Sequence, residues 1–393
     1  MSLPKVIIIG GGFTGLAAAG KLHAAVQSGQ CELTLIDANQ ESAMIPALPD
    51  YAAGLIPADW VTAPIEKHLP PNTTFIQTKV TGIACKEKVI HTDTGDLSFD
   101  YVILAMGSCP SPVPEVLKDV TTHTVTSISD ATACKTAFLK HVNDHDYPSI
   151  VINGAGYTGI ELAICMVRGA DRLQKPIDIH LVEMRDSILP FLTERQQQRV
   201  YNSIERHGIT LHTESQIQSA QQGQVQLSDG TTIKNPLICR TEGTMAPIDP
   251  DESALARLTD GRFQITPTLV LEEFPYIFAA GDAAAFHTPH GYLRKAVNFA
   301  FYAGKHAGMN VARAINRKPL RPFKPVDLGW VIPLGDDSVG QAFGSLPLGG
   351  KMGLRMHYVM CGYRNYNMQN FLRMCGHAVR AGAKREQTRK GDI

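Results

Sequence analysis

The amino-acid sequence predicts an α/β protein built around two parallel sheets, and three features predict it. Residues 5–37 and 149–183 share one design: an apolar run, a glycine-rich turn, a helical pattern and a second apolar run that ends in a carboxylate. A third feature is the apolar run Tyr276–Ala280, which leads into Gly281 and Asp282. Each repeated segment is a βαβ unit of about 30 residues, and such units form parallel sheets.

The first unit is predicted as a strand at Val6–Ile9, an Ala-rich helix to about Ser28 and a strand at Leu33–Ile36. The second unit repeats this order, with a strand at Ile150–Ile152, a helix to about Arg168 and a strand at Ile177–Val182. The repetition predicts two separate nucleotide-type folds in one chain.

The turn of the first unit fits the pattern G-x-G-x-x-G. Gly10 makes the tight turn, Gly12 lets a pyrophosphate approach the backbone, and Gly15 lets the helix pack close to the strand. The helix N-terminus can then hold the phosphates. A carboxylate after the second strand can accept hydrogen bonds from ribose hydroxyls. The predicted dinucleotide site therefore comprises Gly10, Gly12, Phe13, Thr14, Gly15 and Asp37.

The turn of the second unit fits the same pattern and predicts a second dinucleotide site. Its candidate residues are Gly154, Gly156, Tyr157, Thr158, Gly159 and Glu183. Glu183 favours a free ribose hydroxyl over a 2′-phosphate, so NADH is preferred to NADPH. Arg185 stands two residues further on and could accept a 2′-phosphate, which leaves NADPH as the less favoured alternative.

Length and composition limit the other classes of function. A chain of 393 residues is long enough for two or three domains. The formal net charge is zero, which argues against nucleic acid as a partner, and no metal site is predicted. The N-terminus reads as a buried strand rather than a secretory signal, and no apolar stretch is long enough to span a bilayer. We therefore expect a cytoplasmic protein, soluble or peripheral at the inner face of the cell membrane.

The late part of the chain resembles the two-dinucleotide-domain flavoprotein superfamily. Residues 268–271 and 276–282 are similar to its flavin-closing motif, in which the aspartate, here Asp282 after Gly281, holds the ribityl chain. Residues 101–108 resemble its A-T-G-S crossover segment, with Met106 in place of threonine before Gly107, and Gly243 stands in a weaker second copy. The resemblance implies FAD at the first glycine turn and NADH at the second.

In that superfamily the FAD domain is interrupted by the NAD domain. The same order here implies an FAD domain at 1–112 and 266–324, an NAD domain at 113–265 and a small C-terminal α+β domain at 325–393. The implied fold class is α/β, with two Rossmann-like dinucleotide-binding domains.

The segment 44–51 argues against a disulfide as the electron acceptor, because it contains no cysteine where disulfide reductases need a redox pair. Pro46 and its neighbours instead resemble the loop of type II NADH dehydrogenases, the single-subunit NADH:quinone reductases. Glu161, two residues after the second glycine turn, also resembles that family, in which the glutamate handles protons at the acceptor. A carboxyl buried near a flavin would gain proton affinity and suit proton transfer. The alternative for Glu161 is a capping or packing carboxylate.

One segment departs from the type II family. Where two glutamines would line the quinone site, this chain has Asn298 and, near the later position, Tyr302. The start of the segment looks more like that of sulfide:quinone reductases, which use cysteines beside the flavin; Cys134, Cys165 and Cys361 are available. Lys295 either contacts the flavin or is a solvated helix charge.

Three readings of the function follow. The first is a peripheral NADH:quinone reductase. The second is a soluble NADH-dependent reductase of another acceptor, or a relative of sulfide:quinone reductases. The third is a non-enzymatic redox-signalling flavoprotein similar to apoptosis-inducing factors. A homodimer is left open.

The tail bears on this choice. Residues 328–343 are predicted as strand–turn–strand, with the turn at 335–338. Residues 352–380 interleave Met and aromatic residues with arginines. They are either a basic amphipathic helix on a membrane surface or a core helix packed on the FAD domain. Residues 384–393 are expected to be disordered.

Overall fold

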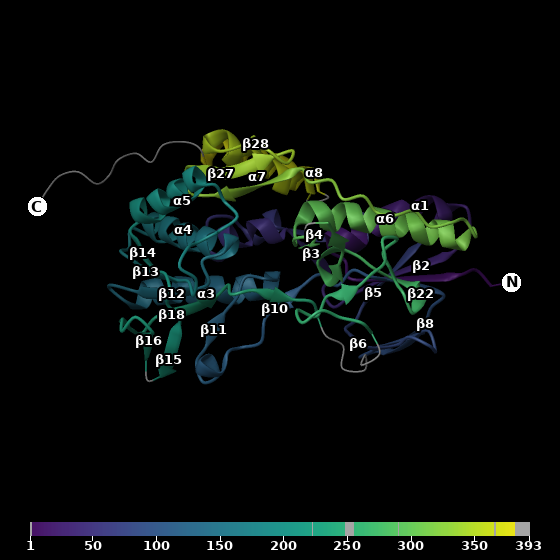
Figure 1. Cartoon of the computed structure of the whole chain (residues 1–393), viewed down its shortest axis with the longest axis horizontal. Coiled ribbons are helices and arrows are strands. Elements are labelled where there is room, and N and C mark those ends of the chain that lie inside the picture. The colour runs from purple at the N-terminus through teal and green to yellow at the C-terminus, as the bar shows by residue number, and fades with distance from the viewer. Residues whose placement is uncertain (1, 222, 248–254, 290, 365–366, 382–393) are drawn as a thin grey trace, which may run out of the picture. The chain divides into compact units, whose positions relative to one another are not determined.

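The computed structural model describes residues 2–221, 223–247, 255–289, 291–364 and 367–381 (Figure 1). Residue contacts divide the chain into two compact units. The first unit comprises residues 1–43, 63–110 and 244–327, and the second comprises 44–62, 111–243 and 328–393. Compared with the expected division, the contacts group 44–62 and the tail with the second dinucleotide fold, and 244–265 with the first. The expected disorder of 384–393 concerns residues outside the described ranges.

The first unit is built on a sheet in the order β21-β22-β9-β1-β2-β5. All neighbours are parallel except β21, which pairs antiparallel with β22. The bounds of its strands are β1 Lys5–Ile9, β2 Glu32–Asp37, β5 Thr73–Gln77, β9 Tyr101–Leu104, β21 Val270–Leu271 and β22 Phe274–Ala279. The strands predicted early in the chain and before Gly281 are thereby confirmed, and they belong to one sheet.

Helices α1 (Phe13–Gln27) and α6 (Val297–Ile315) lie side by side in this unit (Figure 1). Two glycines of α6 allow the contact. A Cβ added at Gly304 would lie 2.1 Å from the carbonyl oxygen of Thr14, and one at Gly308 would lie 2.5 Å from that of Ala18. The helix that carries the first glycine turn is therefore fixed by a backbone-to-backbone approach that any larger residue would obstruct.

The second unit contains a parallel sheet in the order β11-β18-β12-β13-β14. The bounds are β11 Thr122–His123, β12 Ser149–Asn153, β13 Asp178–Val182, β14 Ile209–His212 and β18 Leu237–Arg240. Helices α3 (Ile128–Asp144), α4 (Tyr157–Arg172) and α5 (Glu194–Arg206) lie in the same stretch of this unit as the sheet. Helix α4 runs four residues beyond its predicted end at Arg168. Gly169 follows Arg168 but does not end the helix, because the buried face continues through Gly169 and Ala170.

Smaller elements complete the two units. Antiparallel sheets are formed by β6 Val80–Ala84, β7 Val89–Thr92 and β8 Gly95–Ser98; by β15 Ile217–Gln221, β16 Gln224–Leu227 and β17 Thr232–Lys234; and by β26 Gly329–Pro333, β27 Ser338–Ala342 and β28 Leu346–Pro347. Short pairs are β3 Glu41–Ala43 with β4 Thr62–Pro64, β10 Cys109–Pro110 with β19 Thr244–Met245, β20 Phe263–Gln264 with β23 Ala284–Ala285, and β24 His287–Thr288 with β25 Gly291–Tyr292.

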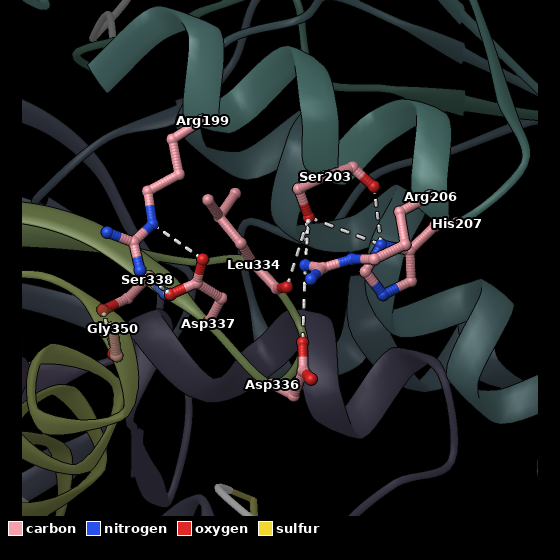
Figure 2. Close-up of polar contacts among 9 residues, drawn as sticks. All are labelled: Arg199, Ser203, Arg206, His207, Leu334, Asp336, Asp337, Ser338 and Gly350. Carbon is pink, nitrogen blue, oxygen red and sulfur yellow. Dashed lines mark hydrogen bonds and ion pairs between the residues drawn. The ribbon is translucent and has the colours of Figure 1, made fainter. Parts of the chain in front are cut away.

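The tail of the second unit begins with the predicted strand–turn–strand, formed by β26 and β27. Figure 2 shows how α5 holds its turn: Arg199 forms a bidentate ion pair with Asp337, with nitrogen–oxygen distances of 2.6 and 2.7 Å. Arg206 lies 3.4 Å from Asp336, and the buried hydroxyl of Ser203 donates to the carbonyl of Leu334. The turn is thus anchored to the NAD-type fold by charge and hydrogen bonds.

Two helices follow the turn instead of one. Helix α7 covers Gly350–Arg364 and α8 covers Met368–Ala381. A Cβ added at Gly362 would lie 3.0 Å from Cβ of Met374, so the helices pack closely on each other. The expectation of one continuous helix over 352–380 was wrong. The tail packs on residues 44–62, which the expected division placed in the FAD domain and which the contacts group with the second unit. Its buried side chains contact other elements of the second unit.

The segment of Pro46 was expected to be a loop but forms a 3₁₀ helix, Ile45–Ala47, and the short helix α2, Leu48–Ala52. Proline is tolerated in a first helical turn, where its missing N–H costs no hydrogen bond. Further 3₁₀ turns are Ala58–Trp60, Glu66–His68, Glu115–Leu117 and Gly281–Ala283. Among the described residues, no helix is both long and apolar enough to cross a membrane.

The contact between α1 and α6 can be tested by placing a methyl group in it. We expect Gly304→Ala to lower the free energy of unfolding by about 2 kcal/mol, because the added carbon overlaps a backbone oxygen that cannot move away cheaply. The measurement is urea unfolding. Gly20→Ala is the matched control: Gly20 is exposed on α1 with open space at its Cβ position, so helix propensity should make that variant slightly more stable. Equal effects of the two changes would contradict the prediction.

Candidate functional site

The carboxyl ends of the first unit's parallel strands bring together the predicted FAD residues. Gly10 follows β1, Asp37 ends β2, Met106 and Gly107 follow β9 shortly after its end, and Gly281 comes two residues after β22. In parallel α/β sheets, ligands bind at this edge. The sequence had placed these residues in four separate segments, and the sheet order places the four segments side by side.

The glycine turn of the first unit has the backbone that the pattern requires. Gly10 has φ +105°, and a Cβ at Gly15 would lie 1.8 Å from the carbonyl oxygen of Gly10. Gly12 forms the N-cap of α1, and within the described residues no side chain caps the helix and no atom lies within 4 Å of a Cβ added there. The N-terminus of α1 is therefore open to a phosphate group.

Asp37 is held against this turn by two backbone amides. Its Oδ2 accepts from the N–H of Gly11 at 2.6 Å, and its Oδ1 accepts from that of Asn39 at 2.7 Å. Oδ1 also accepts from the side-chain amide of Asn39 at 3.1 Å, and Oδ2 keeps a lone pair for a further donor. The carboxylate is thus oriented before any ribose binds.

The Gly281 segment closes the turn from the other side. Gly281 has φ +71°, and a Cβ there would lie 2.1 Å from Oγ1 of Thr14. Asp282 accepts a hydrogen bond from the backbone amide of Ala296, just before α6. Burial raises the pKa of Asp282, while the positive charges of Lys295 and Arg262 oppose the rise. A pocket in this unit is lined by Arg262, Gly281, Asp282, Lys295, Phe299 and Phe323, among others.

Lys295 does not lie on the helix surface, where one of its two interpretations placed it. It precedes the N-cap of α6 and is half-buried, and its Nζ donates to the carbonyl and hydroxyl oxygens of Thr244, at 2.6 and 3.2 Å. Burial lowers its pKa, and the charges of Asp260 and Asp282 act against this. The ammonium group is fixed in the same pocket as Asp282.

The second unit repeats the geometry of the first around Gly154. Gly154 has φ +107°, and a Cβ at Gly159 would lie 1.9 Å from its carbonyl oxygen. Gly156 is the N-cap of α4, again with no side-chain cap in the described part of the chain. By contrast, α3 and α5 are capped by Ser127 and Thr193. The two dinucleotide helices therefore leave their N-termini to a ligand, whereas two other helices satisfy theirs internally.

Glu183 occupies the position in the second unit that Asp37 has in the first. Its Oε2 accepts from the N–H of Ala155 at 3.1 Å, and its Oε1 from that of Arg185 at 3.1 Å. Next to the turn, Tyr157 stacks on Phe191 with ring centroids 5.3 Å apart, while Thr158 is exposed. These groups fit a nicotinamide dinucleotide, with a carboxylate ready for ribose hydroxyls.

Gly243 follows β18, at the same edge of the sheet, with φ +104°. Beside it the carboxylate of Glu242 accepts from Arg240 at 2.6 Å through one oxygen. Its other oxygen is buried and has no hydrogen bond among the described residues. A buried oxygen without a donor next to a dinucleotide turn fits a site completed by its ligand. Sequence reasoning missed Glu242, although its place beside Gly243 pointed to it.

Glu161 lies inside α4 and is 8% exposed. It caps nothing, because the helix begins four residues earlier, at Tyr157. Its Oε1 is buried and lacks a hydrogen bond within the described residues. The imidazole Nε2 of His357 lies 3.7 Å from this oxygen. Burial, and secondarily the charge of Asp50, raises the pKa of Glu161 well above its ordinary value. The capping interpretation is therefore wrong, and the buried carboxyl has a raised affinity for a proton.

The segment of Pro46 contributes a second buried acid that the sequence did not single out. Asp50, on α2, is fully buried and accepts from the hydroxyl of Tyr358 at 3.0 Å. The carbonyl of Pro46 accepts a hydrogen bond from the ring of His357. Only the pairing of α2 with the tail helix α7 could reveal this cluster, and no motif in the sequence encodes that pairing.

Known proteins are similar to this chain in sequence and in fold. Residues 4–315 match the family described as pyridine nucleotide-disulphide oxidoreductase. The chain is 27% identical over 383 residues to the type II NADH:quinone oxidoreductase of Staphylococcus aureus (strain NCTC 8325 / PS 47), covering 91% of this chain and 94% of that protein.

Among solved structures, NDH2 from Plasmodium falciparum in complex with NADH has a similar fold, with a TM-score of 0.79 and 14% identity over 97% of this chain and 99% of that one. The sulfide:quinone oxidoreductase from Aquifex aeolicus has a TM-score of 0.75 and 16% identity, over 94% of this chain and 92% of that one. The α/β architecture with two Rossmann-like folds, which was predicted from the sequence, is confirmed. The chain belongs to the pyridine nucleotide-disulphide oxidoreductase family and is an NAD(P)H oxidoreductase that works with FAD.

Proposed function

We propose that the protein transfers electrons from NADH, by way of FAD, to a quinone at a membrane surface. The observation that carries the proposal is Glu161, a buried acid on the helix that follows the second dinucleotide turn, whose Oε1 has no hydrogen bond among the described residues and whose pKa burial raises. Similarity to a type II NADH:quinone oxidoreductase and to NDH2 supports the same choice of acceptor.

FAD is assigned to the first unit. The N-terminus of α1 receives its pyrophosphate, Asp37 its adenine ribose and Asp282 its ribityl chain, while Lys295 contacts the flavin ring. Met106 and Gly107, which follow β9 in the same unit, are the remaining proposed contacts of the cofactor. Bound FAD supplies a two-electron carrier between a nicotinamide and an acceptor.

NADH is assigned to the second unit. Gly154, Gly156 and Gly159 let its pyrophosphate reach the N-terminus of α4, and Glu183 accepts from its ribose hydroxyls. The carboxylate of Glu183 would repel a 2′-phosphate, which supports NADH over NADPH. Tyr157, Thr158 and Gly243 line the proposed site.

Glu161 is assigned the proton that the reaction needs. Conversion of a quinone to a quinol takes two electrons and two protons, and one hydride from NADH accounts for both electrons and one proton. The second proton has to come from a separate donor. A carboxylic acid whose pKa is raised by burial can hold a proton and donate it to the acceptor oxygen as negative charge develops there.

The cysteines argue against sulfide as the electron donor. Burial raises the pKa of Cys165 and Cys361 well above the ordinary value, so both are thiols rather than nucleophilic thiolates. Cys134 is fully buried, with its sulfur 3.9 Å from that of Cys239. None of these sulfurs is presented as the reactive group that sulfide chemistry requires.

The tail offers a surface for the membrane. We use the name tail surface for the exposed apolar side chains of α7 and α8, which are Met352, Met356, Met360, Tyr363, Met368, Leu372 and Val379. The sequence from 338 to 385 contains seven Lys and Arg residues and no Asp or Glu. Exposed methionines on a cationic segment suit the headgroup region of an anionic bilayer, where a quinone is also found.

The first test separates the two half-reactions. In Glu161→Gln we expect reduction of the flavin by NADH at the normal rate, and reoxidation by a soluble quinone about 100-fold slower, because the amide cannot give up a proton. Stopped-flow absorbance of the flavin measures both rates. Glu205→Gln, an exposed change on α5, is the control and should leave both rates unchanged. Normal reoxidation in Glu161→Gln would overturn the role of this residue.

The cofactor assignment is tested by truncating the two ribose carboxylates. We expect Asp37→Ala to lose FAD during purification. Glu183→Ala should keep FAD but raise the KM for NADH about tenfold, because a charge-assisted hydrogen bond contributes about 1.5 kcal/mol. It should also lower the preference for NADH over NADPH. Flavin absorbance and steady-state kinetics measure these effects, and the opposite pattern would reverse the assignment.

Membrane binding is tested with vesicles of equal parts phosphatidylglycerol and phosphatidylcholine. We expect the protein to sediment with these vesicles, less so at high salt and less so with phosphatidylcholine alone. Met356→Glu should weaken binding about tenfold or more, since one methionine side chain contributes about 2 kcal/mol when buried. Met184→Glu, a change at an exposed methionine outside the tail, is the control. Equal binding of both variants would contradict the assignment of the tail surface.

A further inference from the structure

Two buried carboxyl groups of the second unit face one interior cluster but have different surroundings. Helix α4 presents Glu161, Cys165 and Arg168 along one side, at spacings of four and three residues. Asp50 of α2 lies within the electrostatic reach of all three. Helix α7 adds His357, Tyr358 and Cys361, and α8 adds His377.

Asp50 has the partners that an ionised carboxylate needs. The hydroxyl of Tyr358 lies 3.0 Å from Oδ1 and 3.3 Å from Oδ2, and Nε2 of His377 lies 3.8 Å from Oδ1. Burial alone would raise the pKa of Asp50, but His377 and the charge of Arg168 outweigh it and bring the pKa below its ordinary value. Asp50 is therefore a fixed negative charge in the interior.

The partners of Asp50 are themselves held in place. The ring of Tyr358 is 1% exposed and meets the ring of His377 edge-on, with centroids 4.5 Å apart. His377 also meets Trp60 edge-on at 6.2 Å. Three elements, α2, α7 and α8, therefore fix the position of this one carboxylate.

Glu161 has none of this support within the described residues. Its buried Oε1 accepts no hydrogen bond. The nearby ring of His357 is neutral at neutral pH, because burial lowers its pKa to about 4. A buried carboxyl that has an oxygen without a donor, close to a second carboxylate that is supported, gains affinity for a proton.

We propose that Asp50 is a positioning residue: held by Tyr358 and His377, its buried charge keeps the proton on Glu161 until a reduced acceptor takes it. The inference rests on the proposed function for the identity of the acceptor. In the step itself, the O–H bond of the Glu161 carboxyl breaks, the proton joins the oxygen of the quinol that is forming, and the carboxylate of Glu161 later regains a proton from water. No electrons pass through Asp50 or Glu161.

The experiment follows the carbonyl stretch of protonated Glu161 by infrared spectroscopy of the FAD-loaded protein as pH is raised. Glu161→Gln identifies the band by its loss. In Asp50→Asn we expect the midpoint for loss of the band to fall by about one pH unit, because a like charge no longer opposes ionisation. Asp59→Asn is the matched control, an exposed carboxylate paired with Arg373 beside the same tail helix, and should leave the midpoint unchanged.

A second variant keeps the inference testable if Asp50→Asn does not fold. Tyr358→Phe removes the hydroxyl that donates to Asp50 and keeps the buried ring. Asp50 then competes more strongly for the proton, so the midpoint of Glu161 should fall in the same direction by less. If both variants fold and neither changes the midpoint of Glu161, the proposed role of Asp50 is wrong.

Kinetics distinguish this failure from failure of the proposed function. The rate of flavin reoxidation by a soluble quinone should decline as pH rises through the Glu161 midpoint, and Asp50→Asn should move that decline to lower pH. If Glu161→Gln reoxidises normally, the proposed function fails. If flavin reoxidation is slow in Glu161→Gln, but the fall of the reoxidation rate occurs at the same pH in Asp50→Asn as in the unmodified protein, only the role of Asp50 is wrong.

Discussion

The structure depends on a backbone approach that only glycine permits, made once in each dinucleotide fold. In the first unit, the position of a Gly15 Cβ is 1.8 Å from the carbonyl oxygen of Gly10, and in the second the Gly159 position is 1.9 Å from that of Gly154. With no side chain in the way, each helix begins directly at the carboxyl edge of its sheet, with its N-terminus turned toward the ligand. The same lack of a side chain at Gly281 brings the late strand against Thr14.

These features could be predicted because they are local. A strand, a turn with positive φ and a helix leave their pattern within about 15 residues, and βαβ units dictate parallel pairing. Asp37 and Glu183 could be predicted for the same reason: each ends the strand beside its glycine turn, and the structure ties each carboxylate to an amide of that turn. The late motif around Asp282 was recognised by resemblance, and the parallel pairing of β22 with β9 explains why it belongs to the first sheet.

The buried cluster could not be predicted, because it depends on contacts between segments some 300 residues apart. Asp50 reads in the sequence as an ordinary residue of a proline-rich loop, and Tyr358 and His377 read as aromatic filling of a tail helix. Their hydrogen bond and close approach appear only when α2 and the tail fold into one unit. The tail was misread for a related reason: its pattern of methionines is compatible with one helix, and the close approach at Gly362 that pairs α7 with α8 is a tertiary contact.

A purely structural role explains Asp50 but not Glu161. A buried carboxylate of α2 that contacts partners on α7 and α8 can fix the packing of those elements, and its loss would simply loosen them. A buried acid that finds no partner costs free energy of folding, since an apolar side chain of similar size would pack there without that cost. Such a cost is retained where the group has chemistry to perform, and sites of that kind often pair two acids with opposite proton affinities. The arrangement of one supported carboxyl and one with an unpaired buried oxygen therefore supports the proposal that Glu161 transfers a proton.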